Sequence, residues 1–300
     1  MNPEAAERIA AFRRYLARER RLSVHTDSNY ARDLAALTQF CRQQGIEDWP
    51  QLGHDHVRLF AARSHAAGLG PRSIQRRLSA VRSFLNFLIR EGVLRHNCAV
   101  EVRAPKGQRR LPVTLDADTM GRLLEIPTED VLAIRDRAIM ELLYSSGLRL
   151  AELVGLDLPD LRFADRTVQV LGKGNKARVV PVGGKALAAL TAWLEARRDL
   201  VREGNGAVFV GTGGRRLGAR AIQKRVGYWA VRQGLPMHVH PHLFRHSFAS
   251  HLLESSGQLR AVQELLGHAD IATTQVYTHL DFQHLARIYD ATHPRARKKA

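Results

Sequence analysis

Residues 242–268 read HLFRHSFASHLLESSGQLRAVQELLGH, and this stretch holds the main clues to both fold and chemistry. Its apolar residues recur at helical spacing, so we expect a helix over residues 242–255. On that helix His242 and Arg245 are three residues apart and share a face. A planar guanidinium binds two phosphate oxygens, and an imidazole moves a proton near neutral pH, so the pair suits a phosphate group. Taken alone, the same pair is also typical of an ordinary helix surface.

The same segment predicts a second helix over residues 258–266, followed by a turn at Gly267 that exposes His268. Tyr277 lies nine residues further on (277 − 268). A lone tyrosine near a helix end is usually a packing residue with a wet hydroxyl. As a nucleophile it needs nearby cations or a base, because its pKa of about 10 keeps the hydroxyl protonated at neutral pH.

Two features lie upstream of this stretch. Residues 147–153 read GLRLAEL, where Arg149 follows a glycine, opens a helix and has Glu152 within reach as a partner or cap. Residues 167–171 and 177–182 are β-branched and alternating, which predicts a hairpin whose turn carries Lys173. A turn lysine usually serves solubility, but one at a hairpin tip can also enter a DNA groove and donate a proton.

The first hundred residues predict a helical bundle, with apolar stripes over about 9–16, 23–40, 54–67 and 71–89. The arginines on the polar side of the last stripe form either a solvated face or a DNA face. These arginines are Arg72, Arg76, Arg77 and Arg82.

Residues 104–112, APKGQRRLP, predict a linker, because two prolines flank a glycine and a basic run. The chain therefore divides into a domain over 1–103 and a second over 113–300. Beyond the hairpin, helices are expected over about 183–202 and 219–233, with further helices to the end. The fold class is mainly α, with one small β-hairpin.

The composition favours a nucleic-acid partner. The chain has 300 residues and a net charge of +17, and its arginines are spread along the sequence rather than gathered in a tail. The repulsion among so many positive charges is offset when the protein binds an anionic partner. DNA is a more common partner of this kind than a membrane surface. The two cysteines, Cys41 and Cys98, have no metal-like spacing, and the N-terminus does not resemble a signal peptide, so we expect a cytoplasmic protein.

A metal site is the other interpretation of the histidines at 238, 240, 242 and 246. Pro241 interrupts the series and no carboxylate joins it at ligand spacing, so we expect no metal. No Walker motif or cluster of metal-binding carboxylates occurs either, and we expect no cofactor.

The order of the motifs is more specific than any one of them: Gly-Leu-Arg-x-x-Glu-Leu, Gly-Lys-Gly, His-x-x-Arg-His, Leu-Gly-His, then Tyr. In this order the chain resembles the tyrosine recombinases (the phage integrase family) over its whole length. The resemblance implies a SAM-like core-binding domain over 1–103 and a catalytic domain over 113–300. The catalytic residues that it implies are Arg149, Lys173, His242, Arg245, His268 and the nucleophile Tyr277. Phe244 stands where leucine is commoner, and we expect it to pack.

The resemblance is strongest to the branch of the family that resolves chromosome dimers at cell division. It implies a 3′-phosphotyrosyl intermediate on a dif-like duplex, a XerD-type recombinase as partner in a heterotetramer, and a FtsK-type translocase. An apolar stripe after the tyrosine would dock on a neighbouring subunit or on its own domain; it consists of Phe282, Leu285, Ile288 and Tyr289. The alternatives are a topoisomerase of the same chemistry, a phage or transposon integrase, and a non-catalytic DNA-binding regulator.

Overall fold

The chain folds into two compact units, residues Met1–Arg110 and Leu111–Ala300. The computed structural model describes residues 2–18, 24–107, 114–172 and 177–256. The division falls within the predicted linker 104–112; the functional roles given to the two domains stay predictions. Within the described part of the chain, none of the helices has the length and apolar character needed to cross a membrane.

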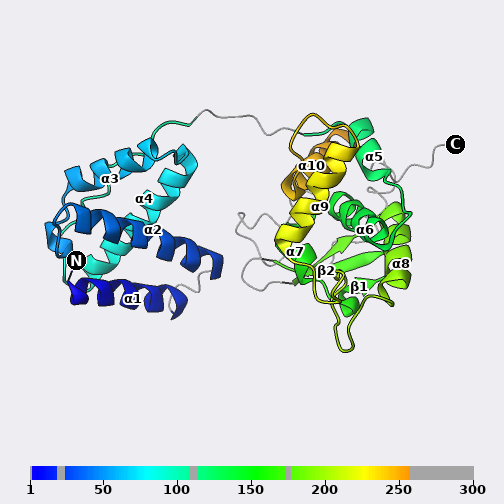
Figure 1. The fold of residues 1–300 in the computed structure, drawn as a ribbon, viewed down its shortest axis with the longest axis horizontal. Coiled ribbons are helices and arrows are strands. Elements are labelled where there is room, and N and C mark those ends of the chain that lie inside the picture. Colours follow the sequence, from blue (N-terminus) through cyan, green and yellow to red (C-terminus); the bar gives the residue numbers. More distant parts are fainter. Residues whose placement is uncertain (1, 19–23, 108–113, 173–176, 257–300) are drawn as a thin grey trace. The chain divides into compact units, whose positions relative to one another are not determined.

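The first unit is a bundle of helices around an aromatic core (Figure 1). The rings of Phe12 and Trp49 both meet Phe84, with centroids 5.4 and 4.8 Å away. The Trp49 indole donates a hydrogen bond to the Ala5 carbonyl oxygen at 2.9 Å, which joins α1 to a 3₁₀ turn. The helices are α1 (Pro3–Arg18), α2 (Val24–Gln43), α3 (His54–Ala66) and α4 (Pro71–Arg90), and the 3₁₀ turn is η1 (Trp49–Gln51).

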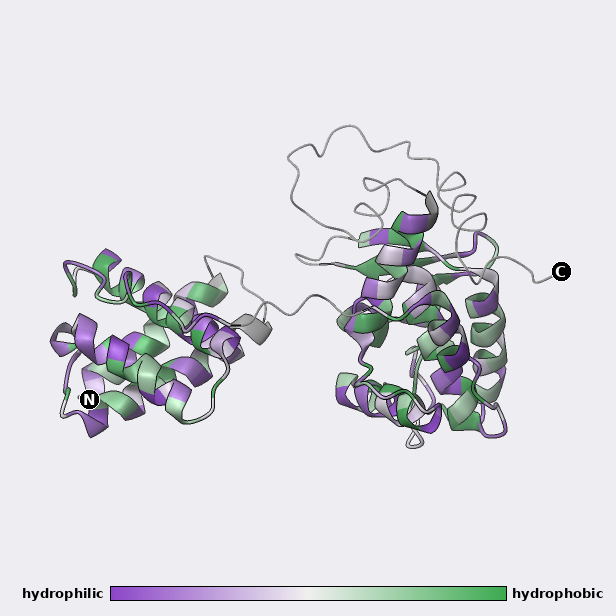
Figure 2. Cartoon of the chain, turned by 90° about the horizontal axis from the view of Figure 1, so that it is seen from above, coloured by the Kyte–Doolittle hydropathy of each residue, from purple (hydrophilic) through white to green (hydrophobic). Residues whose placement is uncertain are grey.

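α3 and α4 lie within a residue of the predicted ranges 54–67 and 71–89, whereas α1 and α2 extend beyond the predicted 9–16 and 23–40. Pro71 opens α4 at a position where a missing N–H costs nothing. Gly68 and Gly92 follow α3 and α4 with φ of +86° and +74°, a conformation that glycine adopts without strain. Apolar and polar residues alternate along the helices of this unit, visible as green and purple bands in Figure 2, as expected of helices that bury one face in a small bundle.

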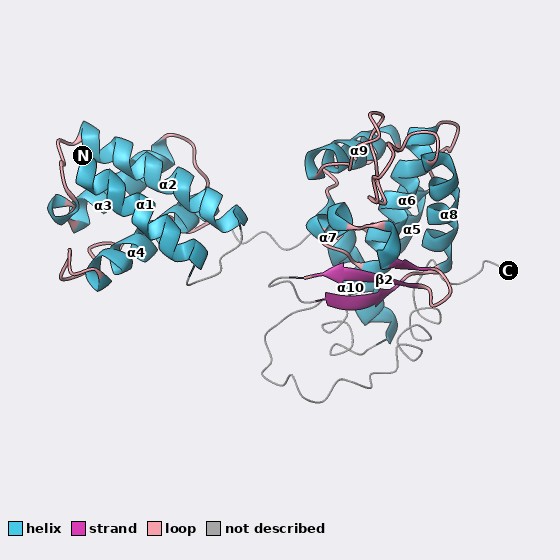
Figure 3. Cartoon of the chain, turned by 90° about the horizontal axis from the view of Figure 1, so that it is seen from below, coloured by secondary structure: helices cyan, strands magenta, loops and turns pink. Residues whose placement is uncertain are grey.

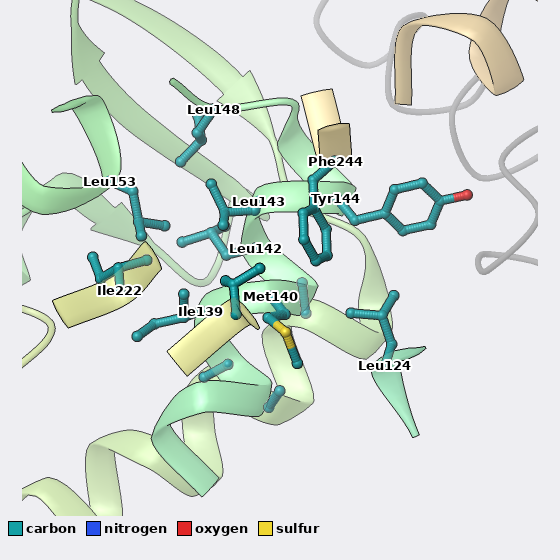
Figure 4. Close-up of a cluster of buried hydrophobic side chains, with 14 of the residues drawn as sticks. Leu124, Ile139, Met140, Leu142, Leu143, Tyr144, Leu148, Leu153, Ile222 and Phe244 are labelled. Carbon is teal, nitrogen blue, oxygen red and sulfur yellow. The ribbon is translucent and has the colours of Figure 1, made fainter. Parts of the chain in front are cut away.

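The second unit is built around α6, which packs against α8, α9 and α10. The buried side chains around α6 include Leu143, Leu148, Leu153 and the predicted packing residue Phe244 (Figure 4). Phe244 is fully buried, so that prediction is confirmed. The helices are α5 (Ala117–Leu124), α6 (Val131–Ser146), α7 (Leu150–Gly155), η2 (Leu158–Asp160), α8 (Gly184–Arg197), α9 (Ala219–Arg232) and α10 (Pro241–Ser256).

The second unit also contains a small antiparallel sheet with strand order β1-β2-β3 (Figure 3). β2 (Thr167–Leu171) and β3 (Ala177–Pro181) are the two strands of the predicted hairpin, and their register pairs Leu171 with Ala177. The sequence did not predict β1 (Leu161–Arg162), because two residues are too short to show alternation. The fold class is confirmed as mainly α with a small sheet. The helices predicted beyond residue 257 lie outside the described residues.

Candidate active site

The junction between α6 and α7 places Arg149. Gly147 ends α6 in the left-handed conformation, with φ of +57°. Arg149 is the N-cap of α7, and Glu152 three residues later returns to it: Oε2 accepts from the Arg149 backbone N–H at 2.8 Å, and Oε1 from its guanidinium at 2.9 Å. The Arg149 side chain keeps 35% of its surface exposed. The expected pairing of Arg149 with Glu152 is therefore present, and the Arg149 side chain stays partly exposed.

Glu152 is a buried carboxylate shared by two arginines. Arg178, on β3, donates from its two terminal nitrogens to the two carboxylate oxygens at 2.7 and 2.9 Å. Burial acts to raise the pKa of Glu152, but the hydrogen bonds from Arg178 and Arg149 outweigh it and hold that pKa below its usual value. Glu152 is therefore a fixed anion, and it orients both guanidinium groups.

Arg245 enters the same site from α10. Only 8% of it is exposed, and its guanidinium donates to the Gly147 carbonyl oxygen at 2.7 Å. Burial, followed by the charge of nearby Arg149, lowers the pKa of Arg245 to about 10. The group still carries its charge at neutral pH. The structure therefore brings Arg149 and Arg245 together, and the excess positive charge beside a single carboxylate suits an anion such as a phosphodiester.

α10 is held against α6 by buried contacts that fix the place of Arg245. The Tyr144 hydroxyl and the His251 Nδ1 are 2.8 Å apart. The Phe248 ring lies so close to Gly147 that an added Cβ would come within 2.5 Å of its Cδ1. A third contact ties α10 to the segment before α5, where the Ser247 hydroxyl accepts from the Leu115 backbone N–H at 3.0 Å. These contacts make the α6–α10 junction a rigid base for the arginines.

His242 lies on the first turn of α10 and is exposed. Its ring centroid is 6.2 Å from that of His240, which is 5.9 Å from that of His238. Burial, and then the charge of His242, lower the pKa of His240. Among the residues that the structure describes, no three or more His, Cys, Asp or Glu side chains are grouped to hold a metal ion.

The other predicted catalytic residues, Lys173, His268 and Tyr277, lie outside the described residues. Arg178 was missed by the sequence reasoning. Its signal was an arginine at the second position of the strand that follows the hairpin turn, but its partner is 26 residues away. No local spacing reveals such a contact.

In the first unit, three of the four predicted DNA-binding arginines bond within the domain. Arg76 and Arg77 pair with the fully buried Asp33 at 2.5 and 3.5 Å. Arg82 donates to the backbone carbonyl of Ala99 at 2.9 Å, and also to that of Val102. Arg72 is exposed near the start of α4. Contact of these residues with DNA stays a prediction.

Comparison with known proteins gives a family for both units. Residues 113–284 match the profile described as "Phage integrase family", and residues 9–92 match "Phage integrase, N-terminal SAM-like domain". The chain is 56% identical over 292 residues to "Tyrosine recombinase XerC" of Azotobacter vinelandii, covering 97% of each chain. It is 51% identical over 296 residues to the protein of the same name from Serratia marcescens, covering 99% of this chain and 97% of that one.

Solved structures share the fold. The XerH site-specific recombinase bound to a palindromic difH substrate has a TM-score of 0.71 at 22% identity, covering 93% of this chain and 83% of that chain. The Tn1549 transposon integrase in complex with transposon right end DNA has a TM-score of 0.72 at 19% identity, covering 93% and 97%. With these family matches and near-complete relatives, the chain belongs to the phage integrase family and is a tyrosine recombinase, an enzyme that cleaves and rejoins DNA.

Proposed function

We propose that the chain recombines a dif-like duplex together with a XerD-type recombinase, in a heterotetramer that resolves chromosome dimers at cell division. The observation that carries the proposal is the pair of guanidinium groups, Arg149 and Arg245, held together at the α6–α7–α10 junction. The relatives named XerC, similar over nearly their whole length, support the choice of substrate and partner. A FtsK-type translocase as activator and a cytoplasmic location complete the proposal.

In the proposed reaction, Arg149 and Arg245 bind the non-bridging oxygens of the scissile phosphate and stabilise the charge of the transition state. The Tyr277 oxygen forms a bond to phosphorus while the bond from phosphorus to the 5′ oxygen breaks. His242 takes the tyrosine proton, Lys173 gives a proton to the departing 5′ oxygen, and His268 adds a hydrogen bond to the phosphoryl group.

The product of this step is a 3′-phosphotyrosyl ester, which keeps the energy of the broken phosphodiester bond. A 5′ hydroxyl from the second duplex then attacks the ester and exchanges the strands. Neither ATP nor a metal ion takes part in this proposed scheme. Residues 1–103 act as the core-binding domain and residues 113–300 as the catalytic domain.

A suicide-substrate assay tests this function. A nicked dif-like duplex, from which the cleaved fragment diffuses away, is incubated with the chain alone and with a XerD recombinase. We expect an SDS-resistant protein–DNA complex that forms on the dif-like duplex, and strand exchange that needs the partner. The control is a scrambled duplex of the same length and base composition. Equal capture on the scrambled duplex, or no capture with the partner present, contradicts the proposed function.

A further inference from the structure

Arg178 lies in the candidate active site, but the proposed reaction gives it no role. Its two terminal nitrogens donate to the two carboxylate oxygens of Glu152, at 2.7 and 2.9 Å. The side chain of Arg178 is 18% exposed and that of Glu152 is 3% exposed, so this two-point contact is largely shielded from water. Charges that are shielded from water act on one another more strongly than charges at a surface. The guanidinium of Arg178 therefore serves the Glu152 carboxylate.

Other contacts also hold the strand that carries Arg178. β3 packs directly on α6, and β2, its neighbour in the sheet, packs on α7. Arg178 itself pairs with Val170 in the ladder between β2 and β3. Because these contacts already place the strand, we expect Arg178 to act on the site through the charge and the hydrogen bonds that it gives to Glu152.

The two oxygens of Glu152 are shared between two arginines. Oε1 accepts from the Arg149 guanidinium at 2.9 Å and from the Arg178 guanidinium at 2.7 Å. Oε2 accepts from the Arg149 backbone N–H at 2.8 Å and again from Arg178 at 2.9 Å. Burial acts to raise the pKa of Glu152, and the hydrogen bond from Arg178 is the strongest of the effects that lower it. Arg178 therefore meets much of the carboxylate's need for positive charge, which weakens its pull on the Arg149 guanidinium.

The same charges reach Arg245. Burial, and then the charge of Arg149, lower the pKa of Arg245, while Glu152 acts to raise it and Arg178 to lower it. These four side chains thus form one electrostatic group, with three guanidinium groups around a carboxylate. If the charge of Arg178 were removed, Glu152 would be offset by Arg149 and Arg245 alone, the two groups that the proposed reaction assigns to the non-bridging oxygens.

We propose that Arg178 is a positioning residue that acts through Glu152: it offsets the charge of the carboxylate, so that Arg149 can bind the scissile phosphate. The inference rests on the proposed function, since it takes Arg149 as a ligand of that phosphate. Without Arg178, Glu152 would draw the Arg149 guanidinium towards itself. Its negative charge would also oppose the charge that develops on the phosphoryl oxygens in the transition state.

The test compares Arg178→Gln, which removes the charge, with Arg178→Lys, which keeps the charge but lacks the planar fork. Single-turnover cleavage of a suicide substrate is measured with the full chain, at protein concentrations that saturate the duplex and at a temperature below the melting point of each variant. Neither binding nor unfolding then limits the rate. We expect Arg178→Gln to slow cleavage by about 10²-fold, as for the misplacement of a catalytic group. Arg178→Lys should cleave about 10-fold faster than Arg178→Gln, because the charge beside Glu152 is restored.

A double-mutant cycle shows whether Arg178 acts through Glu152. In Glu152→Gln the negative charge is gone, so Arg178 has no charge left to offset. We expect Arg178→Gln to slow cleavage no further in that background. Arg178→Lys takes its place in the cycle if Arg178→Gln does not fold.

Arg162→Gln is the matched control. It makes the same chemical change at an exposed position of the same sheet, where the guanidinium donates to the Gln169 side chain at 3.1 Å. It should cleave at the wild-type rate.

Three results overturn the inference. They are a wild-type rate for Arg178→Gln, an Arg178→Lys variant no faster than Arg178→Gln, and losses that multiply when the changes at 152 and 178 are combined. Failure of the proposed function looks different: the wild-type chain itself would form no covalent complex on the dif-like duplex.

Discussion

Arg245 is a buried cation, so it needs a hydrogen-bond acceptor and an anion close by. A guanidinium with 8% exposure is costly unless it is bonded, and here it donates to the Gly147 carbonyl beside the anionic Glu152. Arg245→Lys keeps the charge but loses the planar fork. We expect single-turnover cleavage to fall by about 10²–10³-fold, as for loss of one preorganised donor.

The matched control for that prediction is Arg198→Lys, the same change at an exposed position directly after α8. It should cleave at the wild-type rate. A wild-type rate for Arg245→Lys would show that this arginine does not bind the reacting phosphate.

Glu152 gives the site a pH-dependent stability. Its native pKa is below the value of about 4.3 expected in the unfolded chain. The ionised carboxylate therefore contributes stability that is fully present above the unfolded pKa and is lost as pH falls through the native pKa. We expect Glu152→Gln to destabilise the catalytic unit by roughly 3–5 kcal/mol at neutral pH, since it leaves two arginines without their anion.

Urea unfolding of wild type and Glu152→Gln across a pH series checks this. The difference in unfolding free energy should be constant around neutral pH and shrink below about pH 4.3. A difference that does not change down to the acid limit would mean that Glu152 is not ionised in the native protein.

At the scale of single residues, the sequence predicted what depends on local spacing. The contact of Arg149 with Glu152 follows from their three-residue separation at a helix start. The contacts of Arg178 with Glu152 and of Arg76 with Asp33 do not, because the partners are 26 and 43 residues apart and meet only when the elements pack. A helical pattern places Arg76 and Arg77 on the polar face, but it does not show that a buried carboxylate lies beneath that face.

The α6–α7 connection is the element whose geometry matters most to the site. Gly147 combines a φ of +57° with the close approach of Phe248, 2.5 Å from a Cβ built there. Gly147→Ala should therefore combine left-handed strain of about 1–2 kcal/mol with a clash against an aromatic ring. We expect a lower melting temperature and, since the Gly147 carbonyl holds Arg245, slower cleavage as well.

Gly234→Ala is the matched control for this prediction. Gly234 has a φ of +71°, yet a Cβ there meets nothing within 4 Å. It should show the strain alone, with cleavage unchanged once folded. If both variants are equally stable and equally active, the close packing of α6 on α10 is not what fixes Arg245.

Most elements were predictable because their ends carry strong local signals. Asp116 caps α5, Pro71 opens α4, and Gly147 ends α6. The hairpin was predicted because its strands are long enough to alternate. β1 was not, because its two residues pair with β2 only through tertiary packing.

The whole molecule is strongly cationic, and its charge predicts how it binds duplex DNA. With a net charge of +17, the observed binding constant should fall steeply with salt, with a log–log slope of roughly −0.9 per phosphate contacted. If both units bind the duplex, residues 1–107 and 114–300 made separately should each show a shallower slope than the full chain. Fluorescence anisotropy across a salt series measures all three.

A slope for residues 114–300 equal to that of the full chain would mean that the first unit makes no phosphate contacts. That result would contradict the assignment of residues 1–103 as a core-binding domain. It would leave the catalytic proposal standing, because the residues of that proposal all lie in the second unit.

Cleavage of DNA through Tyr277 is the step on which the proposed function depends. The most direct measurement is mass spectrometry of proteolysed protein–DNA complexes trapped on a suicide substrate, with Tyr277→Phe alongside the wild type. We predict a nucleotide adduct on Tyr277 through a 3′ phosphate, and a variant that binds the duplex but gives no SDS-resistant complex. An adduct on another residue, a 5′ linkage, or a covalent complex formed by Tyr277→Phe would contradict the account.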